Sequence, residues 1–217
     1  MSPSIGVLAA IATLAAASLP PAGAPATSGD AVGDAVGDAD LDAVEAALLA
    51  LVLSGDPAEN NQCNVSGAHG FAQSLPPSGA WPDVNYTDRT RTGAWQPEIH
   101  LRRQLAMAIA ARETLQAANR TDAVLVAAVH RSLAFWFSGD APNGTTFPFG
   151  FIHSANWFTG EIWDNAVLGN TALAFEPWLT AVERHTIVEI MMRANWQKYV
   201  TTDPLSLVAW LGLGMSP

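Results

Sequence analysis

Two acidic side chains in the second half of the chain have the types and spacing for acid–base chemistry. Glu161 and Asp164 are three positions apart, which places both carboxylates on one face if the segment is helical. Such a pair can hydrolyse a glycosidic bond, with one group acting as acid and the other as base. Acidic residues are also common at helix starts, where the helix dipole favours negative charge. We prefer that second interpretation and keep a glycoside hydrolase as an alternative.

Metal and phosphate chemistry have no motif in this chain. The five histidines form no His-Glu-x-x-His pattern, and the single cysteine, Cys63, leaves no paired-Cys arrangement. A glycine-rich phosphate loop and a Gly-x-Ser-x-Gly elbow are absent from the sequence as well. We therefore expect no metal and no other cofactor. A lone cysteine also excludes an intrachain disulfide, so stability must come from packing.

Two aromatic segments suit another kind of chemistry, the stacking of sugar rings. The first runs from Trp81 through Tyr86 to Trp95, and the second is Asn156-Trp157-Phe158 in a polar loop. An aromatic face fits the C–H face of a pyranose, while nearby amides bond its hydroxyls. The competing interpretation is burial in the core. We prefer burial for the tryptophans on expected helix faces, which are Trp136, Trp163, Trp178 and Trp196.

Helices are the elements expected to position these residues. An apolar stripe bounded by Asp40 as N-cap and Gly55 as a stop predicts the first helix. Its inward residues would be Leu41, Val44, Leu48, Leu51 and Val52. Residues 60–93 are rich in Pro, Gly, Ser and Asn and are expected to form a loop.

Four more helices are expected after this loop. The second opens at Pro97, and the third spans residues 122–137 with Thr121 as N-cap and Gly139 as its end. The fourth covers residues 161–175, and the last follows a capping box at residues 180–183 and reaches residue 199. No segment alternates with period two, so the sequence predicts an all-α fold of helical hairpins.

The two ends of the chain differ from this helical middle. Residues 1–26 carry no charge and contain an apolar stretch followed by small-x-small sites, which is typical of a signal peptide cleaved after Ala26. Residues 27–40 contain Gly-Asp-Ala-Val twice and are expected to be a low-complexity linker. Residues 41–217 then form the domain, which we expect to be truncated because the last residues resemble the opening of another helix.

Glycosylation signals and charge indicate the compartment and the partners. Asn-x-Ser/Thr occurs at four asparagines. They are Asn64, Asn85, Asn119 and Asn143. With the leader, they predict a secreted, extracellular glycoprotein. The net charge of −10 and the absence of Lys/Arg runs argue against nucleic acid as a partner. No later segment has the length of a membrane helix, so we expect no membrane association of the mature form.

Three features, in this order, resemble the N-terminal α/α-toroid domain of family 8 polysaccharide lyases, which include hyaluronate, chondroitin AC and xanthan lyases. They are Trp-Pro-Asp-x-x-Tyr from Trp81, then Trp95 followed by His-Leu-x-Arg at residues 100–103, and then Asn-Trp-Phe-x-x-Glu-Ile from Asn156. The resemblance covers about residues 80–199. The family usually has Asn-Trp-Trp at the last motif, where this chain has Phe158 in place of the second Trp.

The resemblance implies an incomplete α/α toroid that binds an acidic polysaccharide, glycosaminoglycan-like or xanthan-like. In such lyases the aromatic patch positions the sugar chain, which makes Asn156, Trp157 and Phe158 the expected substrate-binding residues. The family's reaction is β-elimination at a uronic acid, in which an Asn and a His neutralise the carboxylate and a Tyr moves the proton. None of those three catalytic residues can be placed in this chain, so we expect it to be inactive alone. A non-catalytic carbohydrate-binding domain is the remaining alternative.

Overall fold

The computed structural model describes residues 38–54, 63–88, 95–139 and 164–192. Their regular elements are α2 (Asp38–Leu53), η1 (Val65–Gly67), α3 (Ala68–Ser74), α4 (Glu98–Ala118), α5 (Ala123–Ser138), α6 (Asp164–Phe175), η4 (Glu176–Trp178) and α7 (Ala181–Met192). No strand occurs in these four stretches, which confirms the predicted all-α class. Within them, no helix combines the length and hydropathy needed to cross a membrane.

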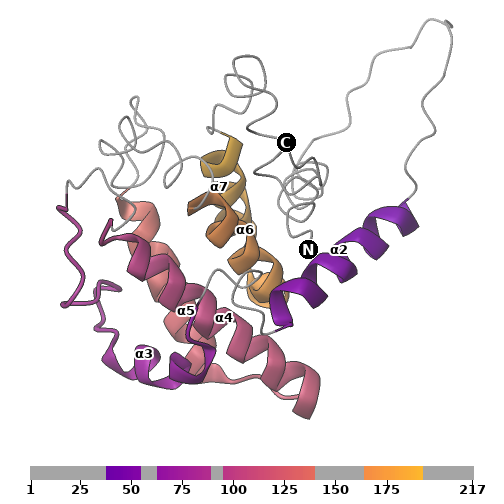
Figure 1. Cartoon of the computed structure of the whole chain (residues 1–217), viewed down its shortest axis with the longest axis horizontal. Helices are drawn as coiled ribbons and strands as arrows, with labels where there is room; N and C mark the ends of the chain where they lie inside the picture. The colour runs from indigo at the N-terminus through magenta and orange to yellow at the C-terminus, as the bar shows by residue number, and fades with distance from the viewer. Residues whose placement is uncertain (1–37, 55–62, 89–94, 140–163, 193–217) are drawn as a thin grey trace, which may run out of the picture.

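The long helix α4 is the central element of the arrangement (Figure 1). It packs against α5 and α6, and the short α3 and η1 also lie against it. Its sequence explains this position, because the consecutive residues Ala106, Met107 and Ala108 are all fully buried. Consecutive residues point in different directions around a helix, so α4 is covered on more than one side. The side chains of α4 therefore form much of the core.

The helix α2 starts earlier than the sequence predicted. It begins at Asp38, inside the segment expected to be linker, and not after a cap at Asp40. Leu48 and Val52 are buried, whereas Val44 and Leu51 are 38% and 43% exposed. The predicted five-residue stripe was therefore too wide, because α2 rests mainly on α6 and needs only a narrow contact line.

The expected loop at residues 60–93 contains two helical elements, η1 and α3, which the sequence prediction missed. Their combined length is too short to show an apolar period clearly, and Gly67 and Gly70 lower their helix propensity. Pro97 is the N-cap of α4, so the helix begins one residue later than the predicted start at Pro97. The predicted capping box is confirmed at α7, where Glu183 accepts from the backbone N–H of Thr180 at 2.9 Å. The expected helical residues 161–163 and 193–199 lie outside the described residues.

The N-cap of α5 is Asp122, so the prediction of Thr121 was wrong. One carboxylate oxygen of Asp122 accepts from the backbone N–H groups of Val124 and Leu125, at 3.1 and 3.2 Å. Both residue types are good N-caps, and the sequence alone does not fix which one the helix uses. Here the helix starts at residue 123, so Asp122 is the residue in the capping position.

Asp122→Ala should lower the free energy of unfolding by about 1 kcal/mol, because two N–H groups of the first turn lose their acceptor. Thr121→Ala is the matched control and should change stability by less than half as much. Urea denaturation of both variants measures the difference. An equal loss in the two variants would contradict the assignment of the cap.

Candidate functional site

The predicted sugar-binding residues, Asn156, Trp157 and Phe158, lie outside the described residues. The same is true of Glu161, the first member of the acidic pair. Asp164 belongs to α6, whose described part begins at this residue. The structure therefore leaves the predicted binding motif untested, and it describes the two upstream motifs in detail.

The aromatic residues of those upstream motifs gather at one place, where α4 begins and α5 ends. His100 is in the centre, with its ring 4.9 Å from that of Trp81 and 5.3 Å from that of Trp136. Tyr86 packs edge-on against Phe135 at 4.7 Å. Residues that are far apart in the sequence thus form one cluster, which we call the His100 cluster.

A chain of hydrogen bonds runs through the His100 cluster. The hydroxyl oxygen of Tyr86 accepts from the backbone N–H of Trp81 and lies 3.0 Å from Nδ1 of His100. On the other side of the ring, Nε2 lies 2.9 Å from the hydroxyl of Ser132 and 3.1 Å from its carbonyl oxygen. The Ser132 hydroxyl donates to Oε1 of Gln104 at 2.9 Å. The chain therefore links the 81–86 loop, α4 and α5.

The partners of His100 fix the position of its proton. A carbonyl oxygen only accepts, so Nε2 carries the hydrogen and donates toward Ser132. Nδ1 is then a lone pair, and Tyr86 donates its hydroxyl hydrogen to it. Burial of the whole ring lowers the pKa of His100 from 6.5 to about 3. The imidazole is therefore neutral at physiological pH.

Tyr86 is held as a phenol by the same surroundings. Its partial burial raises its pKa from 10.0 to about 12. A tyrosine that acts as a general base must be deprotonated near the working pH, which requires a lowered pKa. The pKa of Tyr86 is raised instead. Burial thus moves the pKa of Tyr86 and the pKa of His100 away from neutrality in opposite directions.

Trp81 and Trp95 are core residues, with exposed fractions of 1% and 2%. The indole N–H of Trp81 donates to the backbone oxygen of Phe71, and that of Trp95 donates to the backbone oxygen of Asp88. Neither ring has a free face for a sugar, so stacking by these two residues is excluded. Burial is also the observed state of Trp136.

A close contact with α5 holds the loop that carries Trp81. Gly79 has a φ of +79°, a backbone conformation that side chains disfavour. A Cβ atom there would lie 2.3 Å from the carbonyl oxygen of Arg131, so only glycine fits. The backbone of the loop therefore rests directly on the helix that supplies Ser132.

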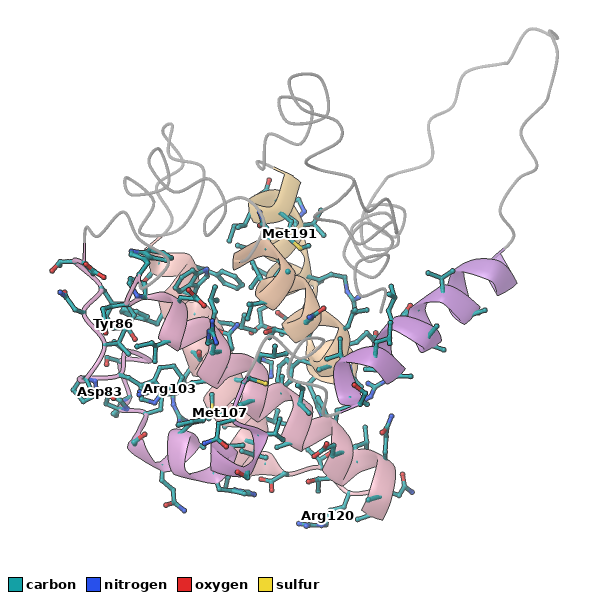
Figure 2. All side chains as sticks on the ribbon, in the orientation of Figure 1. Asp83, Tyr86, Arg103, Met107, Arg120 and Met191 are labelled. Carbon is teal, nitrogen blue, oxygen red and sulfur yellow. The ribbon has the colours of Figure 1, made fainter. Side chains whose placement is uncertain are left out.

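One charged group stands at the edge of the His100 cluster. Arg103 donates from Nη1 and Nη2 to the two carboxylate oxygens of Asp83, at 2.8 and 2.6 Å. Its guanidinium also lies over the rings of Phe71 and Trp81, at 5.3 and 5.5 Å from their centroids. Figure 2 shows Asp83, Tyr86 and Arg103 close together on one side of the molecule. The hydrogen bond from Arg103 holds the pKa of Asp83 below its usual value.

His100, Ser132 and Gln104 are the residues whose role the sequence analysis missed. It considered His100 only as a metal ligand or as part of a family motif. A usable signal was present, because His100 and Gln104 are four apart on a helix face that is otherwise apolar. Polar side chains in such positions need buried partners. Nothing in the sequence pointed to Ser132 as that partner.

The glycosylation signals that the structure describes are on the surface. Asn64, Asn85 and Asn119 are all exposed, and Asn119 ends α4 in a left-handed conformation with a φ of 48°. In the first two signals the hydroxyl of Ser66 or Thr87 donates to the side-chain oxygen of the Asn, at 2.8 Å in each case. Asn143 lies outside the described residues.

The remaining polar residues give no sign of a metal or redox centre in the part of the chain that is described. No group of three His, Cys, Asp or Glu side chains there could hold a metal ion. Cys63 is half-buried, and burial raises its pKa to about 11, which makes the thiol unreactive. His130 is half-buried and lies 2.7 Å from a carboxylate oxygen of Glu183.

Comparisons with protein-family models, with curated proteins and with solved structures found no match to this chain.

The buried state of His100 predicts a pH dependence of stability. The unfolded imidazole binds a proton near pH 6.5 and the folded one only near pH 3, so stability should fall as the pH drops between these values. The loss of unfolding free energy that is due to His100 approaches about 1.4 kcal/mol for each unit by which the pH falls. Urea denaturation from pH 7 to pH 4 should show a smaller slope for His100→Gln than for the wild type. Replacement of the exposed His185 by Gln is the control, and an equal reduction in both variants would contradict the assignment.

Proposed function

We propose that this chain is the N-terminal, helical part of a secreted polysaccharide lyase-like protein, an incomplete α/α toroid that binds an acidic polysaccharide. One observation carries the proposal. The residues of the two upstream motifs of the resemblance, Trp81, Tyr86, Trp95, His100 and Arg103, belong to one packed unit. This shared packing is what we expect if the two motifs serve one structural unit.

The place of the third motif in the chain also supports the proposal. Trp136, in the last turn of α5, packs on His100 and Trp95. The described end of α5 therefore lies beside the His100 cluster, and Asn156, Trp157 and Phe158 follow it in the sequence. We propose that these three residues bind the sugar chain, with Trp157 as the stacking platform.

The chemistry of the family needs a base at C5 of the uronic acid, a group that neutralises the carboxylate and a proton for the leaving oxygen. Tyr86 is the tyrosine that the structure describes, and its raised pKa and its bond to His100 do not suit it as the base. We therefore propose that this chain supplies binding and that it does not catalyse elimination by itself. The same observation favours the second candidate, a non-catalytic carbohydrate-binding domain.

Secretion and glycosylation are part of the proposal. The support is the leader-like residues 1–26 together with the exposure of Asn64, Asn85 and Asn119. A glycan attached to a surface asparagine does not disturb the packed core. The glycoside hydrolase alternative has weaker support, because it rests on the three-residue spacing of Glu161 and Asp164 alone.

Trp157→Ala should weaken binding to hyaluronan, chondroitin or xanthan by about 1 kcal/mol or more, because an aromatic stacking contact is lost. The melting temperature should change little. Trp136→Ala is the matched control, because that ring is buried and its loss should cost about 3–5 kcal/mol of stability. Titration calorimetry and thermal melts separate the two effects. Unfolding of the Trp157→Ala variant with unchanged affinity in the folded fraction would identify Trp157 as a core residue.

Elimination at a uronic acid leaves an unsaturated ring that absorbs ultraviolet light, whereas hydrolysis does not. We expect this chain to produce no such absorbance from hyaluronan, chondroitin or xanthan, with a family 8 lyase as the positive control. Turnover by the chain itself would refute the proposal that it only binds. His185 and Tyr199 would then be the first residues to replace.

A further inference from the structure

We propose that Arg103 recognises the carboxylate of the uronic acid, and that Asp83 occupies this position while the sugar is absent. The inference rests on the proposed function and names the residue that gives it charge selectivity. It is carried by the geometry of Arg103 at the edge of the His100 cluster.

Arg103 is held in one orientation before any ligand arrives. Its guanidinium lies over the rings of Phe71 and Trp81, so the aromatic contacts fix the plane of the group. Trp81 is itself fixed, because it is buried and its two N–H groups donate to Phe71 and Tyr86. A guanidinium held in this way loses little rotamer entropy when it binds a planar anion.

The partner that Arg103 has in this structure is a carboxylate, and it faces solvent. The side chain of Asp83 is 61% exposed and that of Arg103 is 18% exposed. Because the carboxylate of Asp83 is open to solvent, a second carboxylate can reach the same guanidinium and compete with Asp83. The bidentate geometry seen with Asp83 is the geometry that a uronate would adopt.

Arg103 also keeps donors that Asp83 does not use. Of its five N–H groups, one on Nη1 and one on Nη2 point to Asp83. Among the described residues, no acceptor is bonded to Nε of Arg103. The neighbouring Arg102 differs in this respect, because its Nε donates to Glu98 at 2.7 Å. Arg103 is therefore equipped to bind an external anion.

The location of Arg103 connects it directly to the buried His100 cluster. Trp81 contacts both Arg103 and His100, and His100 packs on Trp136 near the end of α5. Arg103 thus lies directly against the His100 cluster, through its contact with Trp81. In a protein with a net charge of −10, the guanidinium of Arg103 becomes a local positive charge that attracts an acidic polymer once Asp83 has moved aside.

The test compares hyaluronan oligosaccharides with the same oligosaccharides after methyl esterification of their carboxylates. Arg103→Lys keeps the charge and loses the bidentate fork, so it should weaken binding of the acid about tenfold and leave the ester unchanged. Asp83→Asn removes the competing charge and should tighten binding of the acid about twofold to threefold, again with no effect on the ester. Arg102→Lys is the matched control and should change neither affinity. Calorimetry on the full chain measures all four proteins, with thermal melts to verify folding.

The outcomes separate the two proposals. If Arg103→Lys weakens acid and ester equally, or if Asp83→Asn weakens binding of the acid, then the ion pair only holds the loop and the inference is wrong, while polysaccharide binding stands. If the wild-type chain binds neither ligand, the proposed function fails and the inference fails with it. The opposite effects expected for the two variants keep the test decisive even if Arg103→Lys lowers the melting temperature.

Discussion

The burial of one neutral imidazole is the constraint on which the described structure depends. His100 has no exposed surface, and a buried ring nitrogen without a partner would cost about 1–3 kcal/mol. The fold meets this requirement from two directions, with Tyr86 from the preceding loop and Ser132 from α5. Each partner can reach the ring of His100 only when the element that carries it is in its native position. The hydrogen bonds thus specify the positions of the loop and of α5 relative to α4, in addition to stabilising them.

The loop before α4 is therefore an ordered part of the core. Trp81 and Trp95 fill space between the helices, and Gly79 lets the backbone approach α5 closely. At its outer side the same loop carries Asp83, which pairs with Arg103 of α4. A binding group is most effective when its supporting side chains are already locked. The loop thus joins the buried hydrogen-bond chain on its inner side to the Arg103–Asp83 ion pair on its outer side.

The sequence predicted the helices well where their apolar period was long or their capping pattern was complete. The all-α class and the capping box before α7 were predicted correctly, and the start of α4 was predicted to within one residue, because these signals are local. Helix α3 was not predicted, because it is too short to show a period, and Thr121 was predicted as the N-cap in place of Asp122. The His100 cluster was not predicted either. The pairing of His100 with Ser132 joins residues that are 32 positions apart, and no local pattern reports such a contact.

The half-buried thiol of Cys63 gives this protein a natural chemical reporter. In the folded chain its pKa is about 11, against 9.0 for an ordinary cysteine, so the reactive thiolate is about a hundredfold less abundant than in an open chain. Cys63 is the only cysteine, so a thiol reagent has one target and the measured labelling rate reports the accessibility of that thiol alone. Since η1 begins two residues later and packs on α4, labelling would report the detachment of that turn from the central helix.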